Sequence, residues 1–190
     1  MVNVFHHLDV DCIVTSDSKQ LLQSQRLVLP GVGSFDTAIN SIDSLRLRHP
    51  LNQLVLEQLI PVLGICLGMQ IMTDGSDEGK LKGLSWISGH ATLLKSDGFI
   101  KVPHIGWNTV SIPRLSTLSS CIESSNPRFY FVHSYAVTTN SADETVLKTS
   151  HGTSFAAGIE RGNIMGVQFH PEKSHRFGMD LLRSFLNYPC

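Results

Sequence analysis

The sequence predicts an α/β fold in which a mostly parallel central sheet is flanked by helices, with additional antiparallel strands in the C-terminal half. Two observations lead to this prediction. In the first third of the chain, short apolar runs alternate with stretches of helical spacing. From Leu84 onward, short β-prone segments rich in Gly, Ser and Thr follow one another. The 190 residues, 42% of them hydrophobic, suffice for one good core. We therefore expect a single domain over residues 1–190.

The composition excludes several classes of function. Fifteen basic and sixteen acidic residues give a formal net charge of −1, too weak a field to hold nucleic acid or an anionic membrane. No apolar run approaches the roughly 18 residues that span a bilayer, and the start of the chain has no signal-peptide pattern. The four cysteines have no close pair, which argues against disulfides and a cysteine-based zinc site. We expect a cytoplasmic protein with small-molecule or protein partners.

The first elements are short. Residues 2–8 are mixed in character, residues 11–15 are predicted to form a strand, and the turn at 16–18 leads to a short helix. Residues 26–29 are predicted to form a buried strand. The loop at 30–35 follows, and residues 36–45 have helical spacing. The Gly-X-Gly pattern of Gly31 and Gly33 is either a plain connection or a loop whose free backbone N–H groups bind a developing anion at the sheet edge.

A helix at 51–58 leads to the stretch that organises the chain, residues 61–70. Apolar residues run into Gly64, Cys66 follows, and amphipathic residues come after Gly68. This pattern indicates a buried strand that turns sharply into a helix with Cys66 at the turn, where the helix dipole favours a thiolate. The alternative is a buried core cysteine beside a helix-terminating glycine.

After a polar turn at 74–79, the second half is mostly β. Strands are predicted at 90–94, 102–110, 129–135 and 145–149. A hairpin is expected to pair residues 154–159 with 164–169, and a helix at about 179–186 closes the chain.

The second stretch with chemical character is residues 166–174. If the chain stays extended, His170 and Glu172 lie on one face, so the carboxylate can hold one imidazole nitrogen while the other faces outward. A cysteine nucleophile needs such a histidine as general base and then general acid. Taken alone, the pair also fits a surface position at a strand end. One small domain contains the Cys66 turn, the glycine loop and the His170–Glu172 pair. Their occurrence together favours the catalytic interpretation.

Together these stretches resemble the class I glutamine amidotransferase family. The resemblance is carried by Gly64-Ile65-Cys66-Leu67-Gly68-Met69-Gln70 and Phe169-His170-Pro171-Glu172. The segments 30–35, 104–108, 130–135 and 170–174 are similar to the glutaminase subunits of imidazole glycerol phosphate synthase within that family. The similarity runs from about Thr15 almost to the C-terminus.

The resemblance implies a glutaminase with a flavodoxin-like fold and a Cys66, His170 and Glu172 triad. The oxyanion would be met by the backbone N–H groups of Leu67 and, after a peptide rearrangement, Val32. The positions that would hold L-glutamine are Gly31, Gly33, Gln70, Glu78, His133, Ser134 and Tyr135. Neither a cofactor nor a metal is implied, and the remaining histidines show no metal-like spacing.

The implied partner is a cyclase subunit that forms a heterodimer, receives the ammonia and makes imidazole glycerol phosphate in histidine biosynthesis; the assembled synthase is a lyase. Trp107, Tyr130 and Lys173 match positions near that interface. Purely structural roles stay open for three of these residues, because Tyr130 and Trp107 also suit packing positions and Glu78 also suits a solvated turn.

Two departures from the family pattern keep alternatives open. The usual first strand and its glycine-rich turn are missing or truncated, with only residues 2–4 where that turn should finish, which leaves open a non-catalytic interaction subunit. The segment Ser174-His175-Arg176-Phe177-Gly178 resembles paralogues that supply ammonia to sugar-modifying amidotransferases of surface polysaccharide synthesis.

Overall fold

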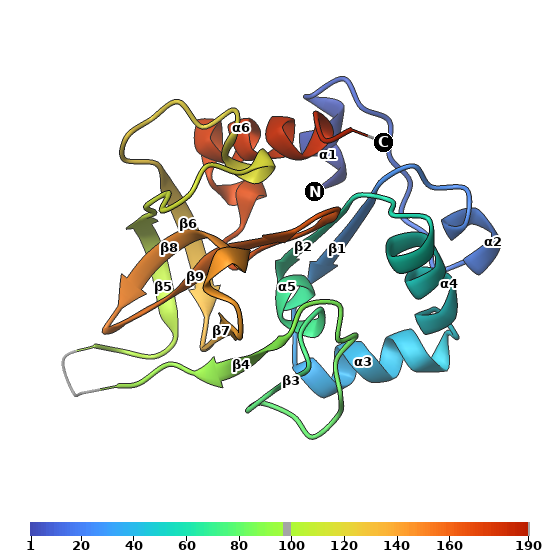
Figure 1. Ribbon diagram of the computed structural model, residues 1–190, viewed down its shortest axis with the longest axis horizontal. Coiled ribbons are helices and arrows are strands. Elements are labelled where there is room, and N and C mark those ends of the chain that lie inside the picture. Colours follow the sequence, from blue (N-terminus) through green and yellow to red (C-terminus); the bar gives the residue numbers. More distant parts are fainter. Residues whose placement is uncertain (97–99, 190) are drawn as a thin grey trace.

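The computed structural model describes residues 1–96 and 100–189, and it is organised around a five-stranded sheet (Figure 1). The strands are β1 (Leu27–Gly31), β2 (Val62–Cys66), β8 (Thr145–His151), β9 (Thr153–Arg161) and β10 (Ile164–Val167). Their order is β1-β2-β10-β9-β8. β1, β2 and β10 are parallel, whereas β10, β9 and β8 are antiparallel neighbours. The predicted α/β class, with parallel strands followed by antiparallel ones, is confirmed.

Two smaller sheets complete the β structure. One joins β3 (Gly75–Ser76), β4 (Gly89–Leu93) and β7 (Tyr135–Thr139), and the other pairs β5 (His104–Thr109) with β6 (Arg128–His133). The predicted strand over 129–135 is therefore two strands that separate at Ser134 and join different sheets. Their separation at this point brings the backbone of residues 133–135 to the junction between sheets.

Helices cover both faces of the five-stranded sheet (Figure 1). α1 (Val2–His6) and α6 (His175–Leu186) lie on one side, and α3 (Phe35–Ser44) and α4 (Arg48–Asn52) lie on the other. α2 (Ser18–Leu21) is a short helix that Asp17 caps by accepting the N–H of Lys19. α5 (Leu67–Ile71) directly follows β2, and a π-helical turn, Gln53–Glu57, extends α4. 3-10 turns cover Thr117–Ser119, Ala142–Glu144 and Pro171–Lys173.

Strand alternation divides the core into two parts, one on each face of the sheet. Along β2, Val62 packs with residues of α3 and α4, whereas Leu63 and Ile65 pack with residues of α1 and α6. All five residues of β2 are buried, as expected for a central parallel strand. The fixed position of β2 determines where its last residue, Cys66, lies.

Three sequence predictions need correction. Residues 11–15 form no strand, because no neighbouring strand pairs with their backbone, and Val14 is 86% exposed. The strand predicted as buried over 26–29 is β1, and in the part of the chain that the structure describes it is an edge strand with only Leu27 buried. The closing helix begins at His175, four residues before the prediction, since Pro171 and the turn after it already redirect the chain.

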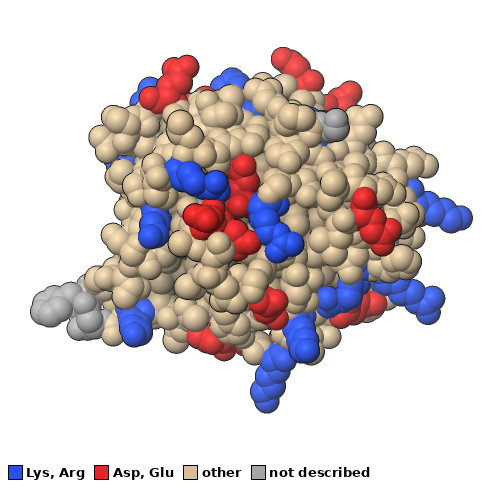
Figure 2. Space-filling view, in the orientation of Figure 1, with Lys and Arg blue, Asp and Glu red and all other residues tan. Residues whose placement is uncertain are grey.

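The surface carries no dominant charge on the face shown in Figure 2, where acidic and basic side chains are interspersed among uncharged ones. This distribution agrees with the formal net charge of −1. Among the described residues, no helix combines the length and the apolar character needed to cross a membrane. Cys12, Cys66 and Cys121 are free thiols.

Candidate active site

Cys66 lies at a sharp turn between β2 and α5. It is the last residue of the strand and the N-cap of the helix, with φ 55° and ψ −111°. A positive φ is unusual for a residue other than glycine and is typical of strained turns that present a nucleophile. The side chain is only 8% exposed. The sequence prediction of a strand that turns into a helix at Cys66 is confirmed.

Glycines allow α5 to approach the two strands at backbone distance. A Cβ on Gly68 would lie 1.8 Å from the carbonyl oxygen of Leu29 on β1, and one on Gly31 would lie 2.6 Å from the backbone N of Gly68. Both distances are far below any real Cβ contact. The turn at Cys66 therefore depends on glycine at positions that pack α5 against the sheet.

The parallel strands bring the predicted site segments to one edge of the sheet. Gly31 pairs with Cys66 in the β1–β2 register, so the glycine loop begins beside the cysteine. β10 runs parallel to β2 and ends at Val167, three residues before His170. Because the carboxyl ends of parallel strands share an edge, residues 31, 66 and 170 converge there despite their separation in sequence.

His170 and Glu172 form a hydrogen-bonded pair. His170 Nδ1 and Glu172 Oε1 are 2.8 Å apart, and since a carboxylate only accepts, Nδ1 carries the proton. The geometry differs from the extended run that the sequence predicted. His170 is extended, with its N–H donated to the Tyr130 carbonyl, but Pro171 starts a 3-10 turn that carries Glu172 back under the imidazole.

The surroundings of His170 favour its charged form. A side-chain hydrogen bond with Cys66, followed by that with Glu172, outweighs burial and raises the pKa of His170 to about 9. Burial disfavours ionisation of Glu172, but the hydrogen bond from His170 and nearby positive charge leave the pKa of this carboxyl below its ordinary value. The three side chains thus form one polar cluster with a protonated imidazole at neutral pH.

The glycine loop lies open beside this cluster. Val32 is 87% exposed, and Gly33 has φ 105°, a conformation that other residues rarely adopt. Leu67, the first residue of α5, is buried and directly follows Cys66. The two residues predicted to stabilise an oxyanion are therefore located on the loop and on the helix start that flank Cys66.

Gln70 and the 133–135 backbone are connected. Gln70 Nε2 donates to the carbonyl of Tyr135 at 2.9 Å and to Gln168 Oε1 at 3.0 Å. His133 Nδ1 also approaches the Tyr135 carbonyl, at 2.8 Å. Both amide hydrogens of Gln70 are used, so the group that remains to contact a ligand is its oxygen. Ser134 is half-buried at the junction of β6 and β7.

Glu78 has a structural contact that the sequence did not reveal. Its Oε2 accepts the N–H of Phe35, the first residue of α3, at 2.8 Å. A carboxylate at this position satisfies a free helix N–H and interacts favourably with the helix dipole. The structure therefore places Glu78 against the start of α3, just after the glycine loop.

Of the residues predicted at a partner interface, Trp107 and Tyr130 lie on the β5–β6 sheet, and Lys173 lies beside it in the 3-10 turn Pro171–Lys173. Trp107 pairs with Tyr130 across the two strands, with ring centroids 6.0 Å apart, and Lys173 Nζ lies 5.8 Å from the Tyr130 ring centre. Trp107 is 39% exposed. His175 stacks on Trp107 at 5.4 Å, a contact that no pattern in the sequence indicated.

Gln168 is a residue of the site that sequence reasoning missed. It is fully buried, and its Nε2 lies 3.6 Å from Cys66 Sγ. It belongs to the 166–174 stretch, but a neutral amide next to a phenylalanine carries no signal of its own. Only the proximity of β10 to β2 reveals it.

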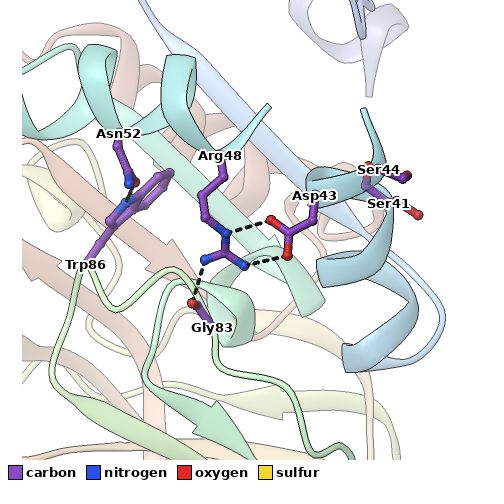
Figure 3. A network of polar contacts seen from close by, with 7 residues as sticks. All are labelled: Ser41, Asp43, Ser44, Arg48, Asn52, Gly83 and Trp86. Carbon is purple, nitrogen blue, oxygen red and sulfur yellow. Dashed lines mark hydrogen bonds and ion pairs between the residues drawn. The ribbon is translucent and has the colours of Figure 1, made fainter. Parts of the chain in front are cut away.

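A polar cluster near α4 is paired internally. A surface hollow near α4 is lined by Asp43, Arg46, Arg48, His49 and Asn52. Figure 3 shows that Arg48 holds both carboxylate oxygens of Asp43 and the Gly83 carbonyl, while Trp86 donates to Asn52. Among the described residues, no three His, Cys, Asp or Glu side chains converge as metal ligands would.

Comparison with known proteins gives a family match over nearly the whole chain. Residues 2–187 match the family described as glutamine amidotransferase class-I. The chain is 42% identical to imidazole glycerol phosphate synthase subunit HisH 2 of Methanococcus maripaludis, covering 97% of this chain and 91% of that protein. It is also 42% identical to the protein of the same description in Pseudomonas aeruginosa, covering 90% and 85%.

The fold has solved counterparts. A glutamine amidotransferase from Thermotoga maritima superposes with a TM-score of 0.66 at 17% identity, covering 97% of this chain and 88% of that one. At this identity the likeness concerns the fold alone.

Proposed function

Because the chain belongs to the class I glutamine amidotransferase family and is an enzyme of that type, we propose that it hydrolyses L-glutamine to glutamate and ammonia through Cys66, His170 and Glu172. The observations that support this most are the convergence of residues 66 and 170 at one edge of the sheet and the 2.8 Å contact between His170 Nδ1 and Glu172 Oε1. This arrangement supports assigning Cys66 as nucleophile, His170 as base and Glu172 as the orienting acid, the set that acyl transfer needs.

In the proposed reaction, Cys66 Sγ attacks the side-chain amide carbon of glutamine while its proton resides on His170. His170 then gives this proton to the leaving nitrogen, the C–N bond breaks, and ammonia departs from a glutamyl thioester. A water molecule, deprotonated by His170, attacks the thioester, and glutamate leaves as the C–S bond breaks and the thiol is restored. Glu172 keeps the imidazole oriented throughout.

The tetrahedral intermediate carries a negative oxygen that needs hydrogen-bond donors. We assign this role to the backbone N–H groups of Leu67 and Val32, the latter after a change in the peptide conformation of the 31–33 loop. The exposure of Val32 and the positive φ of Gly33 are compatible with such a change. One donor of this kind is typically worth ~10²–10³ in rate. Gly31, Gly33, Gln70, Glu78 and residues 133–135 are proposed to surround the glutamine.

The proposed partner is the cyclase subunit of imidazole glycerol phosphate synthase, with which the chain would form a heterodimer and to which it would pass ammonia. The names of the relatives at 42% identity support this assignment. Trp107, Tyr130 and Lys173 offer an exposed aromatic and cationic surface for docking. We place the complex, and its role in histidine biosynthesis, in the cytoplasm.

A second candidate partner is a sugar-modifying amidotransferase. The specific observation in its favour is His175, which stacks on Trp107 within the proposed docking surface and belongs to the segment that departs from the histidine-pathway pattern. Purification of the chain with each candidate partner present decides between them, because only the true partner is expected to co-elute and to increase glutamine hydrolysis.

The test of the catalytic assignment is glutamine hydrolysis, measured as glutamate formed in the presence of the partner. Cys66→Ser is expected to lower the rate by at least ~10³, since the triad nucleophile is lost. Cys121→Ser, at a half-buried cysteine that the proposed mechanism does not use, is the matched control and should retain activity. Equal activity of Cys66→Ser and wild type would refute the assignment, and hydrolysis no faster than with the partner alone in both would favour a non-catalytic interaction subunit.

A further inference from the structure

The sulfur of Cys66 has a defined polar environment beyond the imidazole. The Val132 carbonyl lies 3.7 Å from Sγ and can only accept, so it favours the protonated thiol. Gln168 Nε2 lies 3.6 Å from the same atom and can only donate, so it favours the thiolate. Because the sulfur is buried, each of these interactions acts in a medium that screens it poorly.

The direction of the Gln168 amide follows from its neighbours. The Tyr135 carbonyl only accepts, so Gln70 must present Nε2 to it. The same Nε2 lies 3.0 Å from Gln168, which must therefore present its oxygen, and its own Nε2 is left for the sulfur. Rotating either amide by half a turn would set two acceptors or two donors against each other.

The Tyr135 carbonyl accepts a second hydrogen bond as well. His133 Nδ1 donates to it, which leaves His133 Nε2 to accept from His104 Nδ1 at 3.0 Å. Asn108 Nδ2 in turn approaches His104 Nε2 at 3.3 Å. The backbone of Gln168 is fixed too, because its N–H donates to the Ala157 carbonyl on β9. The amide is therefore held rigidly, with a single orientation.

We propose that Gln168 is a further catalytic residue, whose amide N–H stabilises the negative charge on Cys66 Sγ, and that Gln70 is the positioning residue that fixes its direction. The Gln168 amide supplies the hydrogen bond that water would give to an exposed thiolate. It also offsets the effect of the Val132 carbonyl, which favours the protonated thiol. When the glutamyl thioester forms, the sulfur loses its charge and this hydrogen bond weakens. When the thioester is hydrolysed, the bond strengthens again and favours departure of the thiolate. This inference builds on the proposed role of Cys66.

The test is the pH profile of alkylation of Cys66 by chloroacetamide, followed by mass spectrometry of the peptide that carries it. The titratable groups that act around Cys66 are His170, Glu172, His133 and the N-terminal amine of Met1, and all remain in the variants. Gln168→Met keeps the length of the side chain and removes the donor. It is expected to shift the midpoint of the profile upward by about one pH unit, as loss of one hydrogen bond to a charged group requires.

Gln168→Glu provides a second variant if the methionine variant does not fold. It keeps the shape and the contact with Gln70 but turns an oxygen toward the sulfur, so a larger upward shift is expected. The matched control is Asn163→Leu, which removes a buried amide that precedes β10 and donates to the Val55 and Ile60 carbonyls. It should lower the melting temperature and leave the alkylation profile in place.

A profile unchanged in whichever Gln168 variant folds, or shifted equally by Asn163→Leu, would overturn the inference. With the partner present, the folded Gln168 variant should lose kcat for glutamine with little change in KM, since the donor acts on the sulfur. The test of Gln168 and the test of glutamine hydrolysis can fail independently. A wild type that fails to hydrolyse glutamine but shows a Gln168-dependent profile refutes the function alone, and the reverse pattern refutes the role of Gln168 alone.

Discussion

At the scale of single residues, the site around Cys66 contains one charged imidazole and two neutral ones. His170 is held protonated by Cys66 and Glu172, whereas burial lowers the pKa of His104 to about 4 and that of His133 to about 3. At neutral pH both of the latter are uncharged and serve as directional hydrogen-bonding groups. Cys66, with its positive φ, carries backbone strain of order 1–3 kcal/mol, which the packing around it must offset.

The neutral state of His133 has a consequence for stability. Its pKa is about 3 in the folded protein and about 6.5 when unfolded, so between these values only the unfolded chain takes up the proton. Stability is therefore lost as the pH falls below about 6.5. At pH 5 the loss from this residue is about 1–2 kcal/mol. His104, which is shifted in the same direction, adds to it.

Urea unfolding at pH 7 and pH 5 measures this effect. His133→Gln is expected to reduce the loss of unfolding free energy between the two pH values by about 1–2 kcal/mol relative to wild type. Wild type at pH 7 and pH 8 serves as a control for this residue, because His133 is neutral in the folded state and mostly neutral in the unfolded state there, and the variant should follow the same trend. An identical loss in variant and wild type would show that His133 is not held neutral.

At the scale of elements, the position of Cys66, the proposed nucleophile, depends on contact between α5 and the two strands beneath it. The helix is only five residues long and is held by packing rather than by its own hydrogen bonds. Glycines at 31, 64 and 68 remove the side chains that would separate it from β1 and β2. The turn at Cys66 is a product of this close approach.

Gly68→Ala tests the close approach. The added methyl group would meet the Leu29 carbonyl at 1.8 Å, a backbone atom that cannot move away cheaply. Although alanine favours helix by about 1 kcal/mol over glycine, the clash is expected to dominate and to cost about 3 kcal/mol or more. Thermal and urea unfolding measure the loss.

Gly75→Ala is the control for Gly68→Ala. Its new Cβ would lie 3.3 Å from the His90 side chain, which can give way, so a change within about 1 kcal/mol is expected. Comparable stability of the two variants would show that α5 can move away from β1 without cost, contrary to the packing described above.

At the scale of the whole molecule, the sheet joins two hydrophobic cores. Trp86 is fully buried in the core beside α3 and α4, and its Nε1 donates to Asn52 (Figure 3). Trp107 lies on β5, beyond the core that α1 and α6 cover. β2 contributes side chains to both cores. Unfolding of either core would therefore expose the face of the sheet that lines the other core.

We therefore predict that residues 1–190 unfold as one cooperative unit. Two single-tryptophan variants, Trp107→Phe and Trp86→Phe, report fluorescence from the opposite parts of the molecule. Each should show a urea midpoint that coincides with the loss of circular dichroism in the same variant. Separate midpoints for fluorescence and circular dichroism in either variant would indicate two units.

The parallel-to-antiparallel architecture and the turn at Cys66 were predictable from the sequence because both follow from local patterns. Apolar runs that alternate with helical spacing identify β2 and α3, and glycines around a cysteine identify the turn. The strand predicted at 11–15 failed for the opposite reason. β propensity becomes a strand only where a neighbour pairs with the backbone, and no local pattern reports a neighbour.

The sequence by itself determined the family and the fold class and predicted which residue types carry the chemistry, because motifs are local and their order is preserved along the chain. Only the tertiary structure decided which groups meet. The donation by Gln168 to the sulfur, the stacking of His175 on Trp107 and the capping of α3 by Glu78 join residues 43 to 102 positions apart. Such contacts depend on the register of strands and on how closely α5 packs on the sheet, properties that only the folded chain possesses.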